Sequence, residues 1–155
     1  MYLALKTLHI VSSTILFGTG IGTAFFMWMV NRSVNRQAMA VVTRHVMKAD
    51  LFFTTPSVII QPLSGLALMA MAGFPMHFAP MNWLGLSLLL YIVAGACWLP
   101  VLWLQWKMHQ LAALNPAEPA LPAAYWRYER AWTLLGVPAF VSLVVVFWLM
   151  VAKPF

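Results

Sequence analysis

His9 is the residue in this sequence best placed to do chemistry. It lies in a stretch, Thr7 to Asn31, that contains no Lys, Arg, Asp or Glu. An ionisable side chain inside a membrane-spanning helix costs free energy, so it usually faces a partner, a cavity or a cofactor. An imidazole there can ligate haem iron or a metal ion, or it can hydrogen-bond a neighbouring helix. His9 is therefore a candidate cofactor and metal ligand, with an interhelical hydrogen bond as the alternative.

Two further residues are candidates for the same cofactor site. His77 lies in the break between two apolar segments, at the depth expected of His9. Facing imidazoles in the core of a helical bundle are the usual axial ligands of haem, so His9 and His77 could form such a pair. A solvated turn residue is the other interpretation of His77. Gln61 lies near the middle of an apolar segment, where its amide needs an interhelical partner or a cavity.

The segment around Gln61 is polar on one side and interrupted by proline. The residues that share this face are Ser57, Gln61, Ser64 and Gly65. Pro56 and Pro62 free backbone carbonyls that hydroxyl groups or neighbouring helices must satisfy. By depth, the expected partners of Gln61 are Thr19, Gly20 and Tyr91. The segment either lines a cavity or is a bent helix whose polar groups satisfy one another.

The first apolar segment also carries a face of small and polar side chains. At helical spacing this face contains His9, Ser12, Ser13, Leu16, Thr19, Gly20 and Thr23. Such a face is expected to meet protein or a bound group rather than lipid. Gly18 and Gly22 form a G-x-x-x-G pair on a neighbouring face, which is typical of close helix packing.

Several kinds of site have no pattern in this sequence. There is no H-x-x-x-H, CxxC or E-x-x-H metal motif, no nucleophile-base arrangement and no glycine-rich phosphate loop. The single Cys97 excludes an intrachain disulfide and a cysteine-based metal cluster. His45 and His109 are expected at a lipid-facing boundary, where exposure is usual. The acids, Asp50, Glu118 and Glu129, fall outside the predicted spans, so no carboxylate is expected in the membrane.

Composition determines the elements that must position these residues. The chain of 155 residues is 63% hydrophobic and only 8% charged, whereas a soluble domain carries about 25% charged residues. Apolar stretches predict membrane-spanning helices at about 3–30, 51–73, 82–106 and 131–152, since roughly 20 helical residues cross the hydrocarbon. We therefore predict an all-α, antiparallel four-helix bundle, a single transmembrane domain over residues 1–155. The first span lacks a basic leader, so we expect it to remain rather than be cleaved.

Charge predicts the orientation and excludes one class of partner. The basic residues in or beside the first and third connections are Arg32, Arg36, Arg44, Lys48, Lys107, Arg127 and Arg130, against Lys6 and Lys153 toward the other face. This bias predicts an N-out/C-out, multi-pass membrane protein. The basic residues form no dense run, so they are expected to meet anionic lipid rather than nucleic acid.

The second span is expected to begin as a cytoplasmic helical extension. Its start falls near Gln37, and Arg36, Arg44 and Lys48 share one helical face, which predicts a basic stripe at the lipid headgroups. A solvated amphipathic helix is the plainer interpretation of this stripe.

Several short motifs together resemble a known family. They are Leu5–His9 (LKTLH), Thr54–Pro56 (TTP), Asn82–Leu84, Cys97–Pro100 and the ending Val151–Phe155. The whole chain resembles the small bacterial four-helix membrane proteins of domain of unknown function 2269, which implies a location in the bacterial inner (cytoplasmic) membrane. It is more distantly similar to HemJ, the membrane protoporphyrinogen oxidase, and to CopD-like copper-resistance domains. The HemJ resemblance implies a haem b site with His9 as a ligand. The His and Lys that HemJ-type proteins carry at the start of helix three correspond here to Gly85 and Ser87, which leaves a second haem ligand and catalytic residues unassigned.

The leading functional hypothesis is a membrane protein that binds haem b or serves a membrane redox or haem pathway, beside a redox partner or as a homo-oligomer. One alternative is a HemJ-like oxidase acting on a tetrapyrrole. The other is a cofactor-free accessory or structural subunit, or a small transporter.

Overall fold

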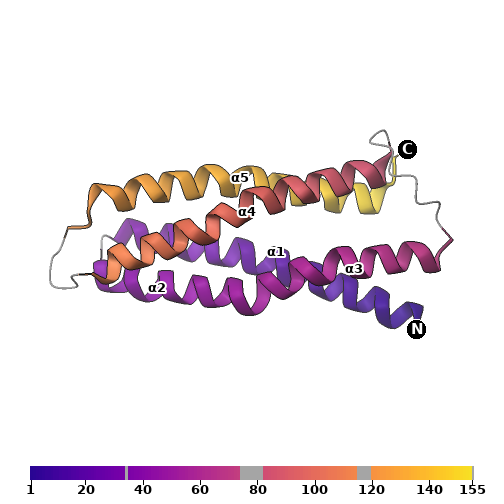
Figure 1. Ribbon diagram of the computed structural model, residues 1–155, viewed down its shortest axis with the longest axis horizontal. Helices are drawn as coiled ribbons and strands as arrows, with labels where there is room; N and C mark the ends of the chain where they lie inside the picture. The colour runs from indigo at the N-terminus through magenta and orange to yellow at the C-terminus, as the bar shows by residue number, and fades with distance from the viewer. Residues whose placement is uncertain (34, 74–81, 115–119, 155) are drawn as a thin grey trace.

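Every regular element in the described residues is helical. The computed structural model describes residues 1–33, 35–73, 82–114 and 120–154. The elements are α1 (Tyr2–Ser33), α2 (Arg36–Ala49), the π-helix η1 (Asp50–Thr54), α3 (Thr55–Met71), α4 (Trp83–Ala113) and α5 (Ala123–Ala152). α2, η1 and α3 run on as one rod, so the chain forms four long rods, each apolar and long enough to cross a membrane. Both termini lie at the same end (Figure 1). The predicted all-α, antiparallel four-helix architecture is confirmed.

Local sequence signals explain where several of the rods begin. The side chain of Asn35 accepts a hydrogen bond from the amide of Ala38, and that of Asn82 accepts one from Gly85. Such caps satisfy backbone donors that a helix N-terminus leaves unpaired. α5 starts directly after Pro122, eight positions before the predicted span, because the residues that follow are compatible with helix. The start of the second rod at Arg36 confirms the helical extension predicted near Gln37.

The rods pack unevenly along their length. α4 packs along α5, α1 packs against α2 and α3, and α2 packs against α4, whereas α1 and α5 touch little. Figure 1 shows the α4–α5 pair and the α1–α3 pair separating toward the end that holds both termini. We call this end the terminal end, and the opposite end, with the α1–α2 and α4–α5 connections, the core end.

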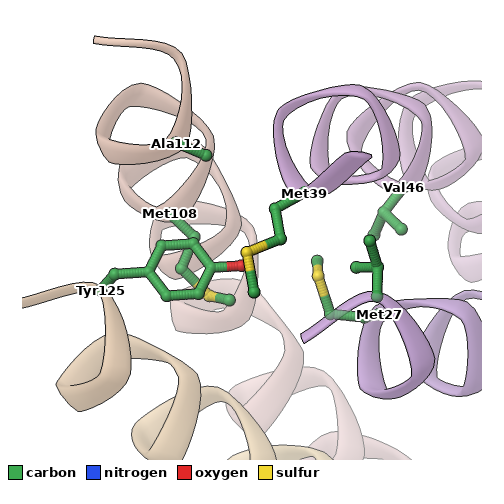
Figure 2. Packing of buried hydrophobic residues seen from close by; sticks show 7 residues of the cluster. Met27, Met39, Val46, Met108, Ala112 and Tyr125 are labelled. Carbon is green, nitrogen blue, oxygen red and sulfur yellow. The ribbon is translucent and has the colours of Figure 1, made fainter. Parts of the chain in front are cut away.

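The core end contains the apolar core. The buried residues of this cluster are Met27, Val30, Met39, Val46, Met108, Ala112 and Tyr125. Figure 2 shows Met39, Met108 and Tyr125 pointing toward one another from α2, α4 and α5. The hydroxyl of Tyr125 donates to the side-chain oxygen of Asn31 at 2.7 Å, which adds α1 to the contact. Four rods therefore meet around this cluster.

The prediction of an exposed basic stripe on α2 is wrong for Arg36. Arg44 and Lys48 are exposed as expected, but Arg36 is buried. Its guanidinium donates hydrogen bonds to the carbonyls of Leu111 at 2.9 Å, Ala112 at 3.2 Å and Ala120 at 3.0 Å. The last carbonyls of α4 have no intrahelical partner and carry negative partial charge, so they attract a cation.

Candidate functional site

His9 is held between α1 and α3 by its Nδ1 atom, which lies 2.8 Å from the hydroxyl oxygen of Ser64. The hydroxyl of Ser64 donates to the carbonyl of Ile60 at 2.6 Å. Because the hydroxyl of Ser64 already donates to the carbonyl oxygen of Ile60, it must accept the hydrogen bond from His9. Nδ1 of His9 therefore carries the hydrogen and donates to Ser64. The lone pair of His9 then lies on Nε2, which makes no hydrogen bond within the described part of the chain.

Gly65 leaves room for the imidazole of His9. A Cβ atom at this position would lie 3.3 Å from Cε1 of His9, closer than an ordinary contact. The absence of a side chain lets α3 approach the ring. Gly65 belongs to the predicted polar face of this segment, and its lack of a side chain makes room for His9.

Gln61 is buried at the same α1–α3 contact. Its Nε2 donates to the carbonyl oxygen of His9 at 2.6 Å and to the hydroxyl of Ser12 at 2.5 Å. The prediction that this amide needs an interhelical partner is confirmed. The expected partners Thr19, Gly20 and Tyr91 were wrong, because α3 lies against a more N-terminal part of α1 than depth alone suggested. A role of Gln61 as a cofactor contact stays a prediction.

Tyr91 hydrogen-bonds a backbone carbonyl of α3 and not the side chain of Gln61. Its hydroxyl donates to the carbonyl of Val58 at 2.6 Å. Pro62, four residues after Val58, has no N–H to give to this carbonyl. The neighbouring helix α4 thus satisfies a group that the proline frees, as expected for a proline within a spanning helix.

The structure places neither His45 nor His109 beside His9. His77 lies outside the described residues. His45 is exposed and lines a cavity of about 380 Å³ between α1 and α2. Nδ1 of His109 lies 3.1 Å from the hydroxyl of Thr43. In the described ranges, no three His, Cys, Asp or Glu side chains converge as a metal site would require.

The glycines of the first helix do not pack as the G-x-x-x-G spacing indicated. On the predicted polar face, Ser12 and Leu16 are buried, but Gly20 is exposed. A Cβ atom added at Gly18, Gly20 or Gly22 would meet nothing within 4 Å in the described part of the molecule. The predicted close packing is therefore not made within this chain.

Sequence reasoning missed the burial of Asp50. This residue was expected outside the spans, and its burial between helices was not anticipated: within the second rod it is 4% exposed. A sequence signal was present: Asp50, Thr54, Ser57, Gln61 and Ser64 recur every three or four residues, and all five are buried. The polar face of α3 therefore continues through η1 and ends in a carboxyl group.

These features define an integral membrane protein built as a bundle of four long helices. A family model described as "Predicted integral membrane protein (DUF2269)" matches residues 3–154, and the chain belongs to this family. No curated protein and no solved structure matches the chain.

Proposed function

We propose that this membrane protein binds haem b through Nε2 of His9. The observation that carries the proposal is the hydrogen bond between Nδ1 of His9 and Ser64. Histidine ligands of metals commonly donate their other ring nitrogen to such a partner, which fixes the ring and its tautomer. Ser64 orients the imidazole, and the lone pair needed for ligation remains on Nε2.

The surroundings of His9 fit one axial ligand. His9 is partly exposed at the terminal end, where the α1–α3 and α4–α5 pairs separate (Figure 1). Gly65 keeps α3 from crowding the ring. Bound haem would supply one-electron redox chemistry, and the polypeptide would orient the iron by fixing His9. His77 as the second ligand stays a prediction, as do a redox partner, a second copy of the chain and an inner-membrane location.

A cofactor-free accessory subunit is the second candidate. It is favoured by the bonds from Gln61 to His9 and Ser12, which with the His9–Ser64 bond join α1 to α3 without any ligand. In that case His9 is a helix-packing residue. The third candidate, a HemJ-like tetrapyrrole oxidase, shares the haem proposal but also requires catalytic residues, which the positions of Gly85 and Ser87 do not supply.

An optical spectrum of the protein purified from haem-replete cells separates these candidates. We expect a Soret band in the wild type, its loss or strong shift in His9→Ala, and an intact band in the control His45→Ala. Ser64→Ala should keep the band but weaken haem binding about 10–100-fold, since it removes the partner of Nδ1. A wild-type protein without haem would favour the accessory subunit, and an unchanged spectrum in His9→Ala would remove His9 from the site.

A further inference from the structure

A buried carboxyl group lies in the second rod, several turns from His9. Asp50 opens η1 and is 4% exposed. Its Oδ1 accepts a hydrogen bond from the hydroxyl of Thr54 at 2.7 Å, and its Oδ2 accepts one from Nε2 of Gln105 at 2.8 Å. Both partners are neutral, so hydrogen bonds alone surround this acid.

Among the residues that the structure describes, no countercharge pairs with the group. On α2 the charged or titratable side chains are those of Arg36, Arg44, His45 and Lys48. On α4 they are those of Tyr91, Cys97, Lys107 and His109. There is none on α3, and none on α1 between His9 and Arg32. Within the described residues, none of them forms an ion pair with Asp50. Arg44, His45 and Lys48 are exposed.

A neutral carboxyl group suits this environment better than a carboxylate. An ionised carboxylate that is buried without a countercharge is far more costly than its protonated form. No heavy atom needs to move to hold the proton. When Oδ1 is protonated, the hydroxyl hydrogen of Thr54 rotates away and Oδ1–H donates to the hydroxyl oxygen instead, while Oδ2 continues to accept from Gln105.

Gln105 provides a second, independent indication of a binding site. It is 2% exposed, and its Oε1 is buried without a hydrogen-bond partner in the described part of the chain. Gln105 also lines a cavity of about 220 Å³ together with Met47, Leu51, Thr55 and Leu102. Buried polar atoms are nearly always satisfied, and a cavity of this size admits water. The orphan oxygen therefore marks a place for a hydrogen-bond donor next to Asp50.

We propose that Asp50, Thr54 and Gln105 form a proton-binding site between the second rod and α4. Asp50 carries the proton at neutral pH. At alkaline pH it transfers this one proton to water in the adjoining cavity and becomes a carboxylate; no other bond changes. The site is separate from His9 and does not depend on haem.

The π-helix supports this assignment. In η1 the amide and the hydroxyl of Thr55 both donate to the backbone carbonyl of Asp50. Pro56, one residue further on, has no N–H to continue the regular pattern. Single π-turns within α-helices frequently lie at functional sites. Here the irregular turn begins at the acid itself.

Infrared spectroscopy of the full-length protein in lipid vesicles tests the proposal. The chain has only 3 Asp and Glu residues, so the C=O stretch of a protonated side-chain carboxyl can be assigned. We expect this band in the wild type at neutral pH and its loss when the pH is raised. The band should disappear in Asp50→Asn and persist in the control Glu129→Gln, which alters a partly exposed acid on α5. Absence of the band from the wild type at neutral pH, or its persistence in Asp50→Asn, would overturn the proposal.

The pH dependence of stability gives a second measurement. The folded state keeps a proton that the unfolded state releases, so the melting temperature of the wild type should fall as the pH rises from 5 to 8, by a few degrees per pH unit. Asparagine can keep the neutral hydrogen bonds, so Asp50→Asn should fold and lose this slope. Identical slopes in both proteins would contradict the proposal.

A variant at Gln105 keeps the proposal testable if Asp50→Asn does not fold. Gln105→Met removes the donor to Oδ2 and should shift the frequency of the carboxyl band without abolishing it. An unchanged frequency would mean that the protonated group is not Asp50.

Discussion

The two ends of the bundle are held together by different kinds of side chain. At the core end the fully buried residues include Met27, Met39, Met108 and Tyr125. Toward the terminal end most of the buried residues are small or polar, namely Ser12, Ser57, Gln61, Ser64 and Ser87, although Leu149 near the end of α5 is buried there as well. Large apolar groups thus predominate at one end, while hydrogen bonds and close approach predominate at the α1–α3 contact at the other.

The lengths of the rods explain the difference. α4 has 31 residues, so it is about 46 Å long at 1.5 Å per residue, against roughly 30 Å of hydrocarbon. The basic residues Arg36, Arg44 and Lys48 lie at the core end, which indicates that this is the end that extends beyond the hydrocarbon. There water drives the burial of methionine and tyrosine. Within lipid, helices gain nothing by hiding apolar surface from each other, and small residues and hydrogen bonds must join them.

The first prediction concerns which end of the bundle faces the cytoplasm. The basic bias predicts that the core end faces the cytoplasm and that both termini lie outside. Reporter fusions placed after residue 122 and at the C-terminus should report a cytoplasmic and an external location, respectively. The reverse pattern would place the apolar core on the outer side of the membrane, although its packing would be unchanged.

Among substitutions, the largest effect is expected at the core end. Met108→Ala removes a side chain with no exposed surface from the α2–α4–α5 contact, so the free energy of unfolding should fall by about 2–5 kcal/mol. Unfolding in detergent micelles measures this change. The control Met29→Ala, at a position of α1 that is 47% exposed, should change stability by less than about 0.5 kcal/mol. Equal effects at the two positions would mean that the cluster is not a true core.

A smaller effect is expected at Arg36. Glutamine cannot reproduce the three hydrogen bonds from the guanidinium to the carbonyls at the end of α4 and beyond it. Arg36→Gln should therefore lower the free energy of unfolding by about 1.5–3 kcal/mol, the usual range for hydrogen bonds to charged groups. The exposed Arg44→Gln is the matched control and should be nearly neutral. Comparable losses from both would favour a general role of positive charge.

The smallest effect is expected at the terminal end. Gln61→Leu deletes the bonds to His9 and Ser12, but measured hydrogen bonds between membrane helices average only about 0.6 kcal/mol. Expression and the free energy of unfolding should therefore stay close to those of the wild type. A changed haem spectrum in a well-folded Gln61→Leu protein would assign Gln61 to the cofactor site. A loss above about 2 kcal/mol would show that the polar contact supports the fold as strongly as the apolar core.

Much of the fold could be predicted from the sequence, because length and hydropathy dictate membrane-spanning helices. The polar face of Ser57, Gln61 and Ser64 followed from helical spacing in the same way. The partners of Gln61 could not be predicted, because depth along a helix does not give the register between two helices. The burial of Asp50 could not be predicted for a related reason: hydropathy does not show that Thr54 and Gln105 hydrogen-bond this carboxyl group between two helices.

The π-helix also determines where the second rod can tolerate a change of length. In an α-helix each residue turns the chain by about 100°, so a single-residue deletion within the regular part of the rod would rotate everything beyond it by about that angle. The π-turn of η1 instead holds one residue more than an α-turn, since the amide of Thr55 donates to the carbonyl of Asp50 five residues earlier. A deletion within Asp50–Thr54 would therefore leave a regular α-turn, with Ser57, Gln61 and Ser64 still facing α1. We expect single-residue deletions to be better tolerated in this short segment than in the α-helices on either side of it.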